Sequence, residues 1–148
     1  KQKLPPQLVG KHIWRDRYED IRHIERYLGH NGVVVRKFFL HVSEDEQKRR
    51  FLERLENPDK NWKFSAADTR ERGFWKDYMR AYETMVRETA SDEAPWYVVP
   101  ADNKWFTRLV VAGAVIDALA SLGLHYPEVT QQQQVELEAA RRAFGAEG

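Results

Sequence analysis

Two short apolar runs, residues 37–42 and 96–99, constrain the fold more than any other feature of this sequence. Both are rich in aromatic and β-branched residues and show little alternation of apolar and polar side chains, which is typical of strands buried on both faces of a parallel sheet. The stretches around them repeat apolar residues every three or four positions, as amphipathic helices do. The order helix, strand, helix, helix, strand, helix predicts an α/β fold with right-handed parallel crossovers.

Two strands make a small sheet for a domain of this size. With 148 residues the chain is long enough for one domain, and a content of 42% hydrophobic and 12% aromatic residues excludes disorder for most of it. We therefore expect the second half of a doubly wound parallel-sheet fold, with part of the first strand's surface left uncovered.

Local signals place the helix ends. Asn31-Gly32 is expected to stop the first helix, because these residues favour a left-handed turn. Ser43 and Glu46 have the spacing of a capping box, and Ser65 is expected to open one long helix that runs as far as Val86. Asp102 is placed to cap the last helix. Residues 109–122 of that helix are apolar almost all round, so we expect it to be buried.

The overall charge excludes several classes of protein. The 24 Lys and Arg against 23 Asp and Glu leave a net charge of +1, so nucleic acid is disfavoured as a partner. The absence of Cys excludes disulfides, thiolate catalysis and Cys-type zinc sites, and is compatible with the reducing cytoplasm. The longest apolar run, residues 109–116, is too short to cross a membrane, and no signal peptide is visible.

Basic residues concentrate between positions 48 and 72. They are Lys48, Arg49, Arg50, Arg54, Lys60, Lys63, Arg70 and Arg72. Arg50 and Arg54 are one helical turn apart, so we expect both side chains to point away from the core and to be free for one anion. Arg suits phosphate because its planar fork donates two parallel hydrogen bonds. Lys60 and Lys63 are expected in a loop that could close over a ligand. An ordinary solvated charged helix is the alternative.

The loop at residues 100–104 is a second candidate site, because it follows a strand and opens a helix. Ligands of α/β folds bind at the carboxyl ends of parallel strands. A simple helix cap with an exposed Lys104 is the alternative. The five His show no spacing typical of a metal site, and the sequence contains no Gly-rich phosphate loop.

Six stretches, in this order, resemble the polyphosphate kinases of type 2. They are GKHIW at 10–14, KFFLHVS at 37–43, EQKRRFLER at 46–54, NWKFS at 61–65, WKDY at 75–78 and APWYVVPAD at 94–102. The resemblance covers residues 4–127 and leaves out the Gln-rich tail at 128–148, which we expect to be peripheral or mobile.

The resemblance implies the carboxyl-terminal half of a P-loop kinase of the thymidylate-kinase-like type, with a helical lid at about residues 44–72. Family members transfer a phosphoryl group between inorganic polyphosphate and a nucleotide with Mg²⁺. The family's phosphate-binding loop and acidic metal motif are not in this sequence. Mg²⁺ is therefore expected to be bound mainly by another half, with no metal ligand here, and this chain alone is expected to be inactive.

The resemblance also implies partners and site residues. The partners are inorganic polyphosphate, a nucleotide (ADP, AMP or the guanine counterpart) and further copies in a homo-oligomer. The lid residues expected to act on phosphates in catalysis are Arg50, Arg54, Lys63 and Arg72. Substrate binding is expected from Arg49, Lys60, Arg70, Asp102 and Lys104, the last two near the nucleotide base. A non-catalytic polyanion-binding or interaction module is the main alternative, and an RNA-binding accessory domain that uses the Arg cluster and Trp62 is a third.

Overall fold

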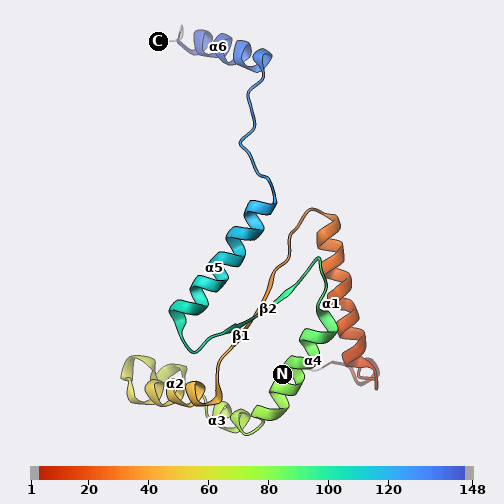
Figure 1. Cartoon of the computed structure of the whole chain (residues 1–148), viewed down its shortest axis with the longest axis vertical. Helices are drawn as coiled ribbons and strands as arrows, with labels where there is room; N and C mark the ends of the chain where they lie inside the picture. The colour runs from red at the N-terminus through yellow and green to blue at the C-terminus, as the bar shows by residue number, and fades with distance from the viewer. Residues whose placement is uncertain (1–3, 146–148) are drawn as a thin grey trace. The chain divides into compact units, whose positions relative to one another are not determined.

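The computed structural model describes residues 4–145, except for the side chains of Lys63 and Ala66. Figure 1 shows its elements in chain order: η1 (Pro6–Leu8), α1 (Ile13–His30), β1 (Lys37–His41), α2 (Glu44–Glu56), η2 (Pro58–Lys63), α3 (Ala66–Arg72), α4 (Trp75–Thr89), β2 (Trp96–Pro100), α5 (Lys104–Ser121) and α6 (Gln131–Gly145). The chain divides into two compact units between residues 116 and 117, inside α5. The predicted α/β class and both strands are confirmed.

β1 and β2 form a two-stranded parallel sheet. The register pairs Lys37 with Trp96, Phe38 with Tyr97, Phe39 with Val98, Leu40 with Val99 and His41 with Pro100. Side chains alternate between the faces of a strand, so Phe39 and Phe38 point to opposite faces. The Phe39 ring lies 4.9 Å from the ring of Tyr82 on α4, and the Phe38 ring stacks on Tyr97 at 5.1 Å. Helix α4 therefore covers the Phe39 face of the sheet.

Lys37 ties α1 to the sheet and to the end of α4, where Arg22 of α1 also donates to the Glu88 carbonyl. Lys37 Nζ lies 2.7 Å from Glu25 Oε2 and donates to the Thr89 carbonyl at 2.6 Å. The Lys37 and Glu25 side chains are only 11% and 10% exposed, so removing either partner would leave a largely buried charge without compensation. At its carboxyl end, α1 stops before Gly32, which has a φ of 77° as the turn signal predicted.

The expected single long helix after Ser65 is two helices, α3 and α4, so that prediction is wrong. Ser65 does cap α3, because its Oγ accepts from the Ala67 N–H at 3.2 Å. The break lies at Gly73 and Phe74, whose N–H groups bond three residues back, to the carbonyls of Arg70 and Glu71. These tighter bonds end the α-helical pattern, and a Cβ at Gly73 would lie only 3.2 Å from the Arg70 carbonyl oxygen.

α5 is more exposed than its sequence predicted. Leu109 and Ile116 are 63% and 65% exposed, so the expectation of a fully buried helix is wrong. A two-stranded sheet offers too little surface to cover every side of an apolar helix. The buried residues of the described chain are mostly small: Thr89, Ala94, Val99, Ala101, Thr107 and Ala118. Within residues 4–145, no helix combines the length and the hydrophobicity that a membrane crossing requires.

Candidate phosphate-binding site

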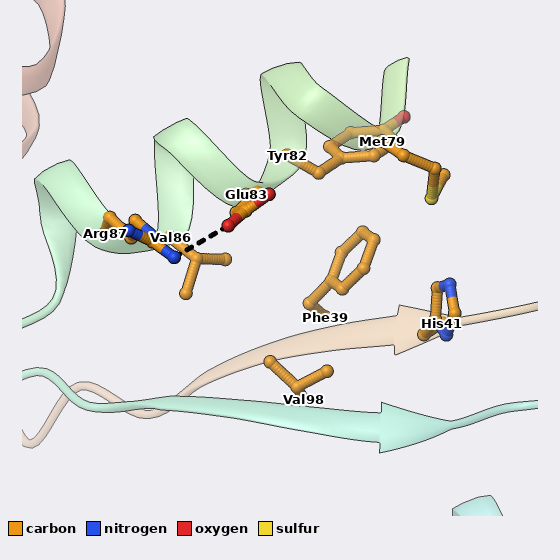
Figure 2. A pocket seen from close by; sticks show the side chains of 8 residues that line it. All are labelled: Phe39, His41, Met79, Tyr82, Glu83, Val86, Arg87 and Val98. Carbon is orange, nitrogen blue, oxygen red and sulfur yellow. Dashed lines mark ion pairs between the residues drawn. The ribbon is translucent and has the colours of Figure 1, made fainter. Parts of the chain in front are cut away.

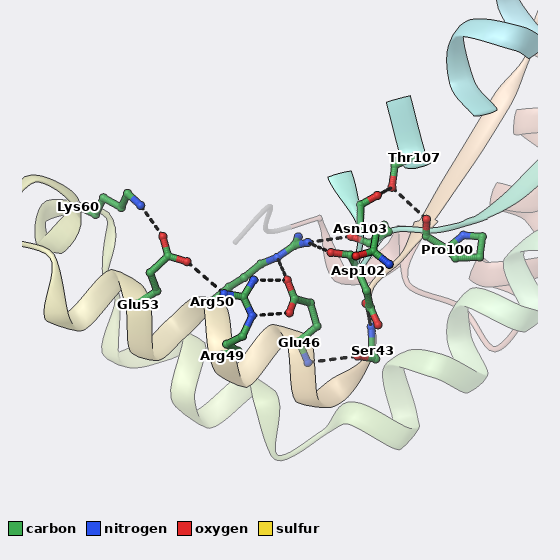
Figure 3. Close-up of polar contacts among 11 residues, drawn as sticks. Ser43, Glu46, Arg49, Arg50, Glu53, Lys60, Pro100, Asp102, Asn103 and Thr107 are labelled. Atoms are coloured by element: carbon green, nitrogen blue, oxygen red, sulfur yellow. Dashed lines mark hydrogen bonds and ion pairs between the residues drawn. The ribbon is translucent and has the colours of Figure 1, made fainter. Parts of the chain in front are cut away.

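The first turn of α2 is capped from two sides (Figure 3). Ser43 Oγ accepts from the Glu46 N–H at 3.2 Å, as the capping-box spacing predicted. The second half of the box does not form: the Ser43 N–H donates to Asp102 Oδ1 at 2.7 Å, and the Glu46 carboxylate binds Arg49 and Arg50. The amino end of α2 is therefore tied to the loop that follows β2.

Arg50 extends this tie. Its Nε donates to Glu46 Oε1 at 2.8 Å, and its Nη2 donates to the carbonyls of Ala101 at 2.8 Å and Asp102 at 3.3 Å. The expectation that this side chain is free is therefore wrong, because the end of β2 offers it two carbonyl oxygens. Its Nη1 has no hydrogen-bond partner among the described residues, and that nitrogen is available to a ligand.

Carboxylates also pair Arg49 and Lys60. Arg49 binds Glu46 through Nε at 2.6 Å and Nη2 at 2.7 Å, and Lys60 Nζ lies 2.6 Å from Glu53 Oε1. Lys60 lies in the 3-10 helix η2, so the segment predicted as a loop is a short helix. The turn is started by Asn57, whose Oδ1 accepts from the Asp59 N–H at 3.0 Å.

These contacts shift the pKa of two carboxyl groups. Hydrogen bonds from Arg49 and then Arg50 lower the pKa of Glu46 from 4.5 to about 2. The hydrogen bond from Lys60 also lowers the pKa of Glu53. Both carboxylates are thus ionised at neutral pH and offset part of the positive charge of the basic segment.

Arg54, Arg72 and Arg70 each have a different local environment. The Arg54 guanidinium lies 5.5 Å from the centre of the Phe51 ring, so Arg50 and Arg54 have different partners although they are one turn apart. Arg72 Nη1 donates to the Glu44 carbonyl and to Gln47 Oε1, each at 2.8 Å, and so ties α3 to α2. Arg70 is exposed and forms no ion pair within the described part of the chain. The side chain of Lys63 lies outside the described part.

A pocket of about 260 Å³ opens beside this tie, at the carboxyl ends of both strands. It is lined by Leu40, Val42, Arg50, Ala101, Lys104, Thr107 and Arg108. Its floor is apolar, and its three cations come from α2 and α5. Lys104 and Arg108 are one turn apart at the start of α5, and neither forms an ion pair with another described residue. Lys104 also interacts electrostatically with Glu53, and two cations one turn apart at a helix amino end can bind one anion together.

Sequence reasoning missed Arg108. Its signal is the four-residue step from Lys104, directly after a strand, which puts both side chains on one face of α5. The loop before α5 also differs from expectation. The helix begins at Lys104, so Asn103 holds the cap position and the predicted cap at Asp102 is wrong. Thr107 Oγ1 holds this loop through the carbonyls of Pro100 at 3.0 Å and Asn103 at 3.1 Å.

A second hollow, of about 380 Å³, lies between α4 and the sheet (Figure 2). Phe39, Met79, Val86 and other apolar side chains line most of it. Its charged residues, Glu83 and Arg87, pair with each other at 2.8 Å, so the hollow offers an anion little unpaired charge.

The described carboxylates of this chain do not form a site that fits Mg²⁺. Within residues 4–145, no three His, Asp or Glu side chains gather as a metal site would require. The two carboxylates beside the pocket already have partners: Glu46 binds two guanidinium groups and Asp102 accepts the Ser43 N–H.

Comparison with known proteins shows that this chain matches a protein family. The model of the family "Polyphosphate kinase 2 (PPK2)" matches residues 7–125. The "ADP-polyphosphate phosphotransferase" of Rhodopseudomonas palustris is 50% identical over 133 residues, which cover 90% of this chain and 46% of that protein. The chain thus spans about half the length of this curated relative.

Two further comparisons cover most of the chain. The crystal structure of polyphosphate kinase 2 from Arthrobacter aurescens TC1 superposes with a TM-score of 0.82 at 37% identity, covering 96% of this chain and 48% of that one. The "Uncharacterized protein in chlN 3'region" of Leptolyngbya boryana is 48% identical over 135 residues, which are 91% of this chain and 99% of that protein.

Proposed function

Because this chain belongs to the polyphosphate kinase 2 family, we propose that it provides the phosphate-binding surface of a polyphosphate:nucleotide phosphotransferase. The observation that carries the proposal is the pocket at the carboxyl ends of β1 and β2, where Arg50, Lys104 and Arg108 meet over an apolar floor. The name of the Rhodopseudomonas palustris relative, which includes ADP and polyphosphate, supports the substrate class.

The chemistry of phosphoryl transfer suits such a surface. The reaction needs positioning and neutralisation of charge on phosphate oxygens more than covalent help from the protein. Arg108 forms no ion pair with another described residue. Lys104 forms none either, although its charge helps to lower the pKa of Glu53, and Arg50 donates its hydrogen bonds through Nε and Nη2.

The other basic residues of the expected lid belong to the same proposal. Arg54, Lys63, Arg70 and Arg72 are proposed to contact the polyphosphate chain when it is bound, whereas Arg49 and Lys60 are proposed to act after exchanging Glu46 and Glu53 for phosphate. The acceptor is proposed to be a nucleoside mono- or diphosphate. Mg²⁺ supplies charge neutralisation when bound, and is proposed to be held outside the described residues of this chain. A homo-oligomer in the cytoplasm is part of the proposal.

Titration calorimetry with tripolyphosphate tests this proposal on the chain itself. We expect binding that weakens as salt rises, because surface cations attract the polyanion through a screened interaction. Addition of ADP or AMP in separate titrations tells whether nucleotide binds the same chain. No heat with tripolyphosphate from folded protein would contradict the proposal.

A non-catalytic polyanion-binding module is the second candidate. The observation that favours it is the basic pocket itself, because three cations that line one pocket are enough to bind a polyanion. Both candidates predict tripolyphosphate binding and no turnover by the chain alone. They differ when the chain replaces the matching stretch of an active relative: a phosphotransferase part preserves turnover, and a binding module does not.

A further inference from the structure

Four residues form a closed set of contacts between α2 and the loop after β2 (Figure 3). We call Ser43, Glu46, Arg50 and Asp102 the α2 clamp. The Asp102 carboxylate accepts the Ser43 N–H at 2.7 Å, the Glu46 carboxylate holds Arg50 Nε at 2.8 Å, and Arg50 Nη2 returns to the Ala101 carbonyl at 2.8 Å. Two of the contacts join segments more than fifty residues apart in sequence.

The clamp decides where one pocket cation sits. Arg50 lines the pocket together with Lys104 and Arg108, which belong to another helix. An Arg side chain on an exposed helix has many rotamers, and holding it in one of them costs entropy. Here the clamp has already fixed the guanidinium, with a side-chain exposure of 28%. A ligand therefore meets a cation whose ordering does not have to be driven by binding.

We propose that Asp102 is a positioning residue for phosphate binding rather than a ligand of the nucleotide. Its carboxylate holds the first turn of α2 through the Ser43 N–H, and so keeps Arg50 in the lining of the pocket that Lys104 and Arg108 also line. This inference rests on the proposed function for the identity of the anion, whereas the clamp itself rests on the hydrogen bonds alone.

The sign of the effect distinguishes positioning from simple electrostatics. Asp102 is a negative charge beside a pocket proposed to bind an anion, so removing it should strengthen phosphate binding if charge alone matters. Positioning gives the opposite result for Asp102→Ala, because the acceptor of the Ser43 N–H is lost. Asp102→Asn separates the two, since an amide oxygen accepts the same hydrogen bond without the charge. Asp102→Glu keeps the charge and displaces the acceptor by one methylene.

The test titrates tripolyphosphate into the full 148-residue chain and its variants, with circular dichroism to verify folding. We expect Asp102→Ala to bind about tenfold more weakly, the order of a lost hydrogen bond to a charged group. Asp102→Asn should bind within about twofold of the original chain or more tightly, and Asp102→Glu should be weakened. Asp45→Ala is the matched control, because Asp45 lies in the first turn of α2 beside Glu46 but is not part of the α2 clamp. It should stay within about twofold.

A second readout does not depend on the ligand. Hydrogen exchange of the Ser43 amide, followed by NMR, should accelerate about tenfold or more in Asp102→Ala and stay slow in Asp102→Asn. If the original chain ignores tripolyphosphate, the proposed function fails while this exchange pattern still supports the clamp. The inference is overturned if Asp102→Ala binds as tightly as the original chain, if Asp102→Asn is as weak as Asp102→Ala, or if the Ser43 amide exchanges equally in all. If Asp102→Ala does not fold, unchanged affinity of Asp102→Glu overturns it.

Discussion

The backbone N–H of Ser43 donates a 2.7 Å hydrogen bond to Asp102, across 59 residues of sequence. The two residues stand at matching places, because Ser43 follows β1 and Asp102 follows β2. Parallel strands bring their carboxyl ends to one edge of the sheet. The bond therefore fixes the start of the basic segment, residues 44–72, against the loop that opens α5. The proposed phosphate pocket lies at this junction.

Arg50→Ala should lower the stability of the chain, although its sequence suggested an exposed side chain without a structural role. The substitution removes the bonds to Glu46 and to the Ala101 carbonyl. Hydrogen bonds to charged groups of this kind are worth about 1.5–3 kcal/mol. Thermal and urea unfolding measure the change. Lys48→Ala, on the same helix, should stay within about 0.5 kcal/mol, and an Arg50→Ala chain that unfolds like Lys48→Ala would refute the structural role.

Glu46 should make the stability of the chain depend on pH in the acid range. Its pKa is lowered from 4.5 to about 2 in the folded chain, so it contributes stability that is fully present above pH 4.5 and is lost as the pH falls toward 2. The difference in melting temperature between the original chain and Glu46→Gln should be constant above pH 4.5 and shrink below it. A difference that does not change with pH would contradict this.

Arg108→Gln should weaken tripolyphosphate binding with little effect on folding. Arg108 lines the pocket and forms no ion pair among described residues, so its loss removes a phosphate contact and leaves no carboxylate unpaired. The expected loss is about 10- to 100-fold in affinity, from the worth of one charged hydrogen bond. Arg141→Gln on α6 removes the same charge far from the pocket in sequence and is the control. Equal affinities of the two variants would remove Arg108 from the site.

The isolated chain should self-associate. Leu40 and Val98 are 49% and 59% exposed on a two-stranded sheet, and open strand edges with apolar faces favour pairing with another chain. Sedimentation velocity over a range of concentrations should show the mean sedimentation coefficient rising with concentration. Val98→Thr, which keeps a β-branched side chain, should reduce the rise. A compact monomer at every concentration would contradict the expectation.

Most helix and strand positions could be predicted from short sequence signals. The β-branched runs placed both strands, and Ser43, Ser65 and Asn31-Gly32 placed helix ends, because each signal acts within a few residues of itself. The helix break at Gly73 could also have been predicted, since glycine is a weak helix former. The exposure of α5 could not be predicted from the sequence, because the burial of a helix depends on how much surface the rest of the fold offers it.

The candidate site was predictable in type but not in detail. The sequence identified a basic segment and a loop after the second strand, and the structure places Arg50 of the first against the second. The partners of Arg50 and Asp102 were not predictable, because each contact joins residues more than fifty positions apart. Asp102 lies one residue before the cap position of α5, and its carboxylate accepts the Ser43 N–H instead.

The rate of ATP formation by a grafted enzyme tests the proposed function most directly. In the graft, residues 7–125 of this chain replace the matching stretch of the Rhodopseudomonas palustris relative, and polyphosphate, ADP and Mg²⁺ are supplied. We expect turnover by the graft, and we expect Arg108→Gln in the graft to lower the rate about 10- to 100-fold. A graft that folds and binds tripolyphosphate yet forms no ATP would contradict the account and favour a binding module.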